Sequence, residues 1–349
     1  MAVDLSKIAY RRKIPLDYLS GKAVAIDAYN MIYQFLSIIR QPDGKPLQDA
    51  NGNITSNLSG LFYRTIDMME KGIKPAYVFD GIPSVLKQKT ITSRMRRREL
   101  AYGEWKKAVE EGDMERARSS AMASTRITKE IVEDSKKLLG LMGVPYIEAP
   151  SEGEAQASFM CASGIVYAAA SQDYDTLLFG SKRVVRNLSF SGRRKLPMKN
   201  VYVQVEPELM ELEQTLSSNS ITREQLIFVG IMLGTDFNDG IKGIGPKTAL
   251  KIARQIKSPE ELAQYIKEKY SAEFELDIRE VFDLFMNPEV KNISAEELES
   301  AFRKKVDAPG IVSFMCDERG FDRARIEKQV SRLVKLSGSS KQESINKWF

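Results

Sequence analysis

The chain has 349 residues, 43% of them hydrophobic, and a formal net charge of +5. It contains no histidine and two cysteines, Cys161 and Cys316, which excludes serine–histidine hydrolysis, histidine-bound zinc, histidine general bases and a disulfide framework. No apolar stretch reaches the ~20 residues that span a bilayer, and residues 1–6 do not resemble a secretory signal, so we expect a soluble, intracellular protein with no membrane partner.

Three short apolar runs each end at an aspartate, and we expect them to form buried strands of one parallel sheet. They are Ala23–Ile26 before Asp27, Ala76–Phe79 before Asp80, and the run from Val166 that ends at Asp173. Continuous apolar runs are typical of parallel strands covered on both faces. The carboxyl ends of such strands form the ligand crevice of an open α/β sheet. Carboxylates gathered there repel one another unless a cation lies among them, so these runs predict a metal site.

The segments around these runs predict mainly helices. Helical patterns at 29–40 and 56–71 are separated by turn signals, which gives a βαβ arrangement with the first two strands. Residues 81–124 are charged and contain few large apolar side chains, so we expect projecting helices there. A core-facing helix around 127–142, a short strand at 144–147 and a helix opening at 150–154 follow.

Beyond the Asp173 strand, the sequence predicts a hairpin and then a helical region. We expect the hairpin around Ser191-Gly192, helices from about Ile221 to Leu336, and a flexible linker over Ser337–Ser340.

Four further carboxylates stand where they could join the same site: Asp175, Glu152, Glu154 and Asp236. Each acidic residue also has a structural explanation, because an aspartate after a strand can cap a helix and Ser151-x-x-Glu154 is a capping box. Their combination at one sheet edge favours a metal site instead. Carboxylate oxygens suit hard cations such as Mg²⁺ or Mn²⁺. Two such ions, ~3.5–4 Å apart, are the general solution for phosphodiester displacement.

Basic residues concentrate in two segments, 87–107 and 182–199, and the second carries seven lysines and arginines with no acid. Basic surface beside an acidic pocket suggests a polyanionic substrate that is held or cut with metal ions. Either run alone could instead be a solvated helix face or hairpin.

Residues 240–249 resemble the hairpin of helix–hairpin–helix DNA-binding motifs. Gly243 and Gly245 permit close backbone approach, and Pro246 suits the first position of a helix. The amide groups at that helix start, with Lys247 beside them, would form an anion site that ignores base sequence. A plain glycine turn between packed helices is the alternative.

Residues 342–349 match the box that binds sliding clamps. Gln342 is followed three residues later by Ile345, and then by the aromatic pair Trp348 and Phe349. Aromatic anchors carry much of the binding energy of short peptides. We therefore expect this tail to bind a sliding clamp, proliferating cell nuclear antigen.

Over essentially the whole chain, these residues resemble a flap endonuclease of the structure-specific 5′ nuclease superfamily, in its archaeal form. The motifs that carry the resemblance are Tyr77–Gly81, Ala149–Ala155, Ala170–Asp175 and Gly243–Lys247. It implies an α/β fold whose central sheet is mixed, mostly parallel and flanked by helices (a PIN-like 5′ nuclease core). The implied parts are the nuclease core (1–98 and 141–235), a helical arch (81–130), a helical DNA-binding region (236–336), and the linker with its clamp-binding tail (337–349).

The resemblance also implies roles for single residues. Lys87 and Arg94 fall on the arch residues that grip the scissile phosphate, and Tyr33 falls on a tyrosine that stacks on a base near the cut. The cofactor would be two Mg²⁺ ions, with Mn²⁺ as a substitute. The family's metal carboxylates fall on Asp27, Asp80, Glu152, Glu154, Asp173, Asp175 and Asp236.

The implied function is hydrolysis of one phosphodiester bond at a 5′ flap junction, in Okazaki-fragment processing and repair, with a 5′–3′ exonuclease activity beside it. We expect a monomer in the cytoplasm of an archaeon, associated with the nucleoid. Alternatives are a 5′–3′ exonuclease or junction resolvase of the same superfamily, and a non-catalytic adaptor between DNA and the sliding clamp. Departures from the family pattern touch no expected ligand: Ala2, Thr55-Ser56-Asn57 and Ile82-Pro83-Ser84.

Overall fold

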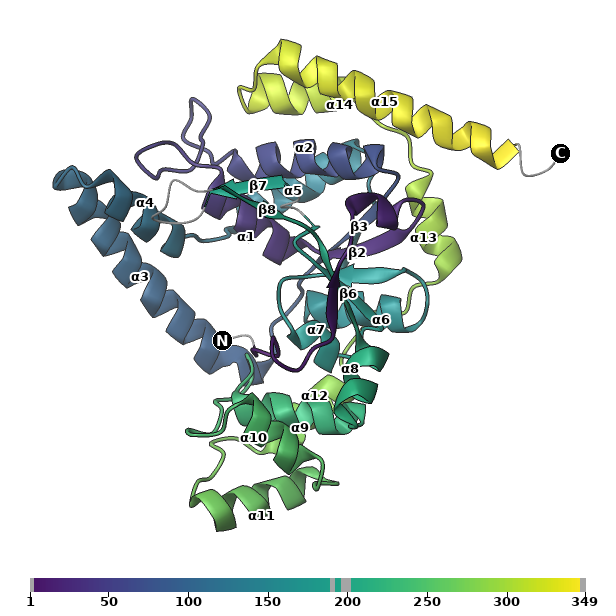
Figure 1. Cartoon of the computed structure of the whole chain (residues 1–349). Coiled ribbons are helices and arrows are strands. Elements are labelled where there is room, and N and C mark those ends of the chain that lie inside the picture. Colours follow the sequence, from purple (N-terminus) through teal and green to yellow (C-terminus); the bar gives the residue numbers. More distant parts are fainter. Residues whose placement is uncertain (1–2, 189–191, 196–201, 346–349) are drawn as a thin grey trace.

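The computed structural model describes residues 3–188, 192–195 and 202–345 (Figure 1). Its centre is a seven-stranded sheet in the order β1-β9-β6-β5-β2-β3-β4, and β7 and β8 pair as a separate ribbon. The strands are β1 (Arg11–Lys13), β2 (Ala23–Asp27), β3 (Lys74–Phe79), β4 (Tyr146–Glu148), β5 (Ala168–Ala170), β6 (Arg183–Arg186), β7 (Gly192–Lys195), β8 (Tyr202–Val205) and β9 (Glu208–Glu211).

The sheet is mixed and mostly parallel, as predicted. The neighbours β4, β3, β2, β5 and β6 run parallel to one another, whereas β9 and β1 add an antiparallel edge. The predicted β2 pairs with β3 over the full length of β2, from Ala23 opposite Lys74 to Asp27 opposite Val78. The third run forms a strand shorter than its apolar pattern, since β5 begins only at Ala168 and not at Val166.

Helices cover both faces of the sheet because alternate residues of each central strand point to opposite sides. Tyr77 and Phe79 enter one core with α1, α2, α5 and the C-terminal helices, whereas Ala76 and Val78 enter another with α6. The helices of this part are α1 (Ala28–Ile38), α2 (Ser56–Glu70), α5 (Lys129–Leu141), α6 (Gly153–Ala162), α7 (Asp175–Leu178) and α8 (Leu212–Asn219).

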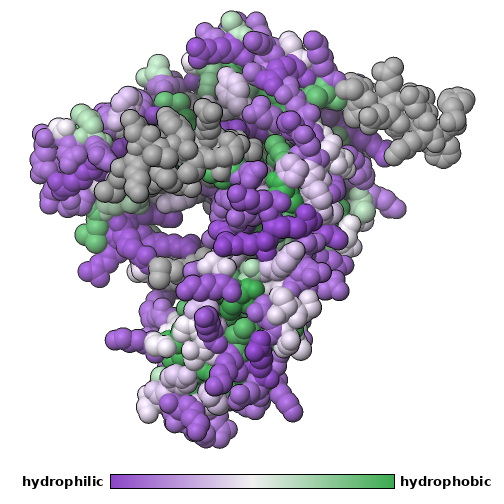
Figure 2. All heavy atoms as spheres, viewed as in Figure 1, coloured by the Kyte–Doolittle hydropathy of each residue, from purple (hydrophilic) through white to green (hydrophobic). Residues whose placement is uncertain are grey.

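A two-helix arm leaves the sheet after β3. It begins with a 3₁₀ turn, η2 (Val85–Lys87), and consists of α3 (Gln88–Glu110) and α4 (Met114–Ala123). Ala108 is the buried residue of α3, so the helix makes little core, as its charged sequence predicts. Its far end contacts the loop after α1, where the Trp105 indole donates to the Asp43 carbonyl at 3.2 Å. Figure 2 shows an opening between this arm and the body, with hydrophilic side chains along the arm.

The helical region that follows the sheet has two parts. Helices α9 to α12 share a core with residues from the N-terminal segment and α7, whereas α14 and α15 pack against the face that α2 covers. No helix among the described residues is long and apolar enough to cross a membrane. The helices are α9 (Arg223–Leu233), α10 (Pro246–Ala253), α11 (Pro259–Tyr270), α12 (Ile278–Met286), α13 (Ala295–Phe302), α14 (Ala308–Val312), the π-helical turn η4 (Ser313–Glu318) and α15 (Arg323–Ile345).

The expected hairpin around Ser191-Gly192 is confirmed as the antiparallel pair of β7 and β8, in which Gly192 lies opposite Val205 and Lys195 lies opposite Tyr202. Its first strand carries Arg193, Arg194 and Lys195 of the second basic segment, whereas Ser191 lies outside the described residues. The β-branched and aromatic residues of β8 favour strand pairing.

The expected flexible linker at Ser337–Ser340 is wrong, because the backbone of these residues is helical and α15 continues through them to Ile345. The helix is anchored earlier by buried Ile326, Val330 and Leu333. Once a helix has nucleated, each added residue gains one hydrogen bond, and serine and glycine cost no more than about 1 kcal/mol each. Figure 1 shows α15 running away from the sheet towards the C-terminus.

Candidate active site

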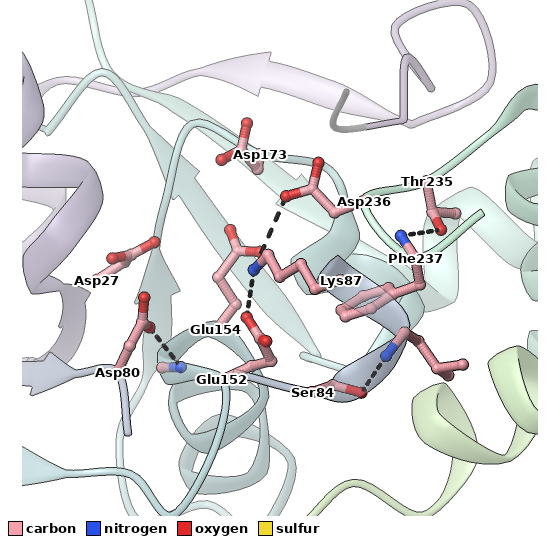
Figure 3. Close-up of polar contacts among 12 residues, drawn as sticks. Asp27, Asp80, Ser84, Lys87, Glu152, Glu154, Asp173, Thr235, Asp236 and Phe237 are labelled. Carbon is pink, nitrogen blue, oxygen red and sulfur yellow. Dashed lines mark hydrogen bonds and ion pairs between the residues drawn. The ribbon is translucent and has the colours of Figure 1, made fainter. Parts of the chain in front are cut away.

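The three strand-end aspartates meet at one edge of the sheet, because β5, β2 and β3 are neighbours. Asp27 closes β2 and caps α1 by accepting from the Asn30 amide at 2.9 Å. Asp80 follows β3 and accepts from the Gly153 amide at 2.7 Å. Asp173 follows β5, and Figure 3 shows it across the edge from Asp27 and Asp80. The predicted gathering of carboxylates is confirmed.

The N-termini of α6 and α7 bring further acids to this edge. Glu154 accepts from the Ser171 hydroxyl at 2.6 Å and the Thr176 hydroxyl at 3.3 Å. Asp175 accepts from the Val3 amide at 3.3 Å. Glu152 stands at the N-cap of α6, but its side chain makes no capping bond, so the alternative of a capping box from Ser151 to Glu154 does not hold.

Two cations from the arm lie over the same edge. The Lys87 ammonium is in direct contact with a Glu152 oxygen and lies 3.8 Å from Asp236, between the two carboxylates in Figure 3. The Arg94 guanidinium donates to both oxygens of Asp236 at 2.6 Å. The predicted arch residues therefore reach the predicted metal carboxylates. We call the seven acids together the acidic edge: Asp27, Asp80, Glu152, Glu154, Asp173, Asp175 and Asp236.

Burial makes negative charge costly at the acidic edge. Desolvation raises the pKa of Asp80 to about 6, against the opposing charge of Lys87. Desolvation, with the charges of Asp236 and Asp173, raises the pKa of Asp175 to about 8. Burial and neighbouring carboxylates likewise raise the pKa values of Asp27, Glu154 and Asp173. The positive charges of Lys87 and Arg94 are thus too few to balance the seven carboxylates of the acidic edge.

The donor set suits a metal ion, although the side chains are not arranged around one. Within residues 3–188, 192–195 and 202–345, no three acidic side chains meet closely enough to hold an ion as they stand. Lys87 lies among them instead. The second oxygen of Glu152, Oε1, is buried without a hydrogen-bond partner, which leaves an acceptor for a cation. An all-oxygen set with one unpaired acceptor fits a hard divalent ion.

Other predicted residues lie outside this cluster. Tyr33 is on α1, with the guanidinium of Arg98 5.9 Å from its ring centroid. Gly243 has φ +89° in the turn between α9 and α10, Gly245 caps α10, and Lys247 is exposed. Pro246 opens α10 as predicted. The loop from α9 that carries Asp236 leads directly into this turn.

The predicted clamp-binding box, residues 342–349, lies only partly within the described residues. Gln342 and Ile345 belong to the backbone of α15, and their side chains lie outside the description. Trp348 and Phe349 lie outside the described residues.

Sequence reasoning missed the polar side chains that hold the acids. Asn30 donates from its amide to Asp173 at 3.2 Å. Ser171 and Thr176 donate to Glu154, as described above. The available signal was spacing, because Asn30 lies in the first helical turn after Asp27 and Ser171 stands two residues before Asp173.

Comparison with known proteins gives the family. Residues 3–101 match the XPG N-terminal domain and residues 143–236 match the XPG I-region. Flap endonuclease 1 of Thermococcus onnurineus is 50% identical over 350 residues, which cover 100% of this chain and 99% of that protein. This chain belongs to the flap endonuclease 1 family.

Solved structures agree with this assignment. Flap endonuclease-1 from Methanococcus jannaschii is 39% identical, with a TM-score of 0.74 over 97% of this chain and 99% of that one. The catalytic core of Rad2 in complex with DNA substrate is 25% identical, with a TM-score of 0.66 over 95% of this chain and 100% of that one. The flap endonuclease is therefore a metal-dependent, structure-specific 5′ nuclease that hydrolyses phosphodiester bonds in branched DNA. This sets aside the non-catalytic adaptor.

Without metal, the flap endonuclease should lose stability as the pH rises. Asp80 and Asp175 have folded-state pKa values of about 6 and about 8, above the ordinary 3.8. Their contribution to stability is complete below about pH 4 and is lost as the pH rises through these values, because the folded state binds the proton more tightly. In EDTA, Asp175→Asn should melt several degrees above wild type at pH 8.5 and close to it at pH 5.

Circular dichroism melts across this range provide the measurement. Glu213→Gln, at an exposed position on α8, is the matched control and should follow the wild-type curve. A wild-type protein whose melting temperature rises from pH 5 to 8.5, in parallel with Asp175→Asn, would contradict the prediction.

Proposed function

We propose that the flap endonuclease cleaves 5′ flaps with two Mg²⁺ ions held by the seven carboxylates of the acidic edge, Mn²⁺ serving as a substitute. The observation that carries this proposal is the convergence of these buried and half-buried acids, with Glu152 Oε1 unpaired. Ions bound there would activate an attacking water and offset the charge that develops on the scissile phosphate. The absence of histidine supports chemistry of this kind, since no imidazole is present to act as a base.

We propose Lys87 and Arg94 as the catalytic side chains that act on the scissile phosphate. Both now pair with acids of the acidic edge, Lys87 with Glu152 and Arg94 with Asp236. Those oxygens are also the proposed metal ligands, so cation binding and these ion pairs compete. Release of the two side chains would leave their charges beside the substrate phosphate, which is where charge-assisted donors stabilise a transition state.

Other residues are proposed to hold the DNA without reading its sequence. The amide groups around Gly243 and Gly245, with the exposed Lys247, would bind backbone phosphates of the duplex. Tyr33 would stack on a base near the cut, which suits any sequence. The Rad2 core, solved with DNA substrate, supports DNA binding by this fold.

A panel of Mg²⁺-dependent cleavage assays tests the function. Flap, nicked and four-way DNA of matched sequence should be cut in that order of preference, with the flap cut at one position near the junction. Preference for the four-way junction would favour a resolvase, and stepwise release of single nucleotides from nicked DNA would favour an exonuclease. EDTA should stop all cleavage.

The C-terminal tail is proposed to bind a sliding clamp, and the enzyme to work as a monomer in the cytoplasm. Among the side chains of α15 that the structure describes, Leu333 is the last fully buried one and Leu336 still packs partly against the core, so the backbone at 342–345 lies six or more residues beyond these contacts. This separation supports a role outside the catalytic core. The archaeal sources of relatives such as that of Thermococcus onnurineus support the compartment.

Deletion of residues 342–349 should leave cleavage of a free flap substrate unchanged and remove stimulation by the clamp. Trp348→Ala with Phe349→Ala should reproduce most of this loss, because aromatic anchors dominate short-peptide binding. Calorimetric titration of the tail peptide against the clamp provides the measurement. Equal stimulation of the full chain and the deletion variant would contradict the proposal, and so would a deletion that slows clamp-free cleavage.

A further inference from the structure

Asn30 forms hydrogen bonds with two of the strand-end aspartates, one from its backbone and one from its side chain. Its backbone N–H donates to Asp27 at 2.9 Å, and its side-chain Nδ2 donates to an oxygen of Asp173 at 3.2 Å. Asp27 ends β2, and Asp173 follows the neighbouring β5, 143 residues along the chain from Asn30. One half-buried residue in the first turn of α1 therefore bonds to both acids, through its backbone to Asp27 and through its side chain to Asp173.

Gln34 engages the end of the Asn30 side-chain amide that does not face Asp173. One helical turn on, Gln34 donates from its Nε2 to Asn30 Oδ1. With its oxygen engaged there, Asn30 presents its NH₂ group to the carboxylate. The reversed amide would place two oxygens together at Asp173 and two NH₂ groups together at Gln34. The order Gln34, Asn30, Asp173 is thus a polar chain with one favourable orientation.

We propose that Asn30, oriented by Gln34, is a positioning residue that sets the direction of the Asp173 carboxylate for divalent cation binding. The inference rests on the proposed metal role of Asp173. Hydrogen-bond partners of ligating carboxylates fix the ligand before the ion arrives, and their loss typically weakens metal affinity by about 10–100-fold. Asn30 leaves the second oxygen of Asp173 available, as a positioning residue must.

The place of Asn30 allows substitution without breaking the core. A small hollow that is open to solvent lies beside Asn30 and Gln34, bordered also by Asp27 and Gln172. The tightly packed side of α1 is a different face, formed by Met31, Ile32 and Phe35. Leucine at position 30 keeps the approximate shape of asparagine and removes both hydrogen-bonding functions of the side chain.

Isothermal titration calorimetry of the metal-stripped full chain with Mg²⁺, and separately with Ca²⁺, tests the proposal without DNA. Asn30→Leu should raise the dissociation constant roughly tenfold or more. Gln34→Leu should act in the same direction with a smaller change, because Asn30 keeps its bond but loses its fixed orientation. Gln214→Leu, at an exposed position on α8, is the matched control and should bind as wild type does.

Cleavage assays give a second signature. The Mg²⁺ concentration for half-maximal rate should rise by the same factor in Asn30→Leu, saturating Mg²⁺ should restore most of kcat, and KM for flap DNA should not change. Unchanged metal affinity in a folded Asn30→Leu overturns the proposal and leaves the two-ion function standing. If Asn30→Leu does not fold, Gln34→Leu decides by the same criterion. A wild-type chain that binds neither cation overturns both.

Discussion

Asp80→Asn and Asp173→Asn should each abolish flap cleavage while DNA binding persists or tightens. Each substitution removes one charged oxygen ligand and keeps the shape of the side chain. Metal ions contribute several kcal/mol of transition-state stabilisation, and about 4 kcal/mol corresponds to ~10³-fold in rate. DNA affinity comes mainly from contacts between basic side chains and phosphates. A carboxylate near these contacts repels the phosphates, so its removal should leave DNA affinity unchanged or increase it.

The fold should survive both changes. Asp80 accepts from the Gly153 amide at 2.7 Å, and an asparagine oxygen can accept the same bond. Removal of a buried charge whose pKa burial raises to about 6 should also stabilise the metal-free protein at neutral pH.

Single-turnover cleavage of a 5′ flap substrate and fluorescence anisotropy of the same DNA in EDTA provide the two measurements. Glu213→Gln removes a carboxylate from the exposed surface of α8 and should change neither. Near wild-type cleavage by both aspartate variants would exclude the hypothesis that the acidic edge binds two metal ions for cleavage.

The acidic edge could be predicted because local pattern determines it. An apolar run specifies a buried strand, and the residue that follows a parallel strand must lie at its carboxyl end. Asp27, Asp80 and Asp173 needed no further information, and their strands are indeed the neighbours β2, β3 and β5. Pro246 at the first position of α10 follows from equally local chemistry.

Contacts between distant side chains could not be predicted. The ion pair of Lys87 with Glu152 spans 65 residues and depends on the path of the arm, which no periodicity encodes. The bond from Asn30 to Asp173 spans 143 residues, and an asparagine near a helix start is ordinarily explained by local capping. Family resemblance supplied Lys87 but offered nothing for Asn30.

Local signals failed where a neighbouring element overrode them. Ser337–Ser340 has the composition of a linker, yet it continues a helix that Ile326, Val330 and Leu333 have already anchored. There the energy of an adjoining regular element outweighs a propensity difference of about 1 kcal/mol.

Arg94→Ala should slow the single-turnover rate by roughly 10²–10³-fold with little change in DNA affinity, because donors that act as charge develops are worth this much. Lys87→Ala should behave similarly, and the two losses need not add, since both side chains reach Asp236. Rapid-quench kinetics with saturating enzyme separates the chemical step from binding.

Metal affinity distinguishes a catalytic role of Lys87 from a merely structural one. The Lys87 ammonium contacts Glu152 and lies 3.8 Å from Asp236, and its pKa is raised because these ion pairs outweigh the cost of burial. A charge so placed competes with cations for the same oxygens. Lys87→Ala should therefore bind Mg²⁺ at least as tightly as wild type while its rate falls, and Lys89→Ala, at an exposed position two residues on, should change neither quantity as much. Weakened Mg²⁺ binding in Lys87→Ala would mean that the lysine organises the carboxylates. If Lys87→Ala and Arg94→Ala instead lost DNA affinity at an unchanged rate, both residues would only bind the DNA backbone.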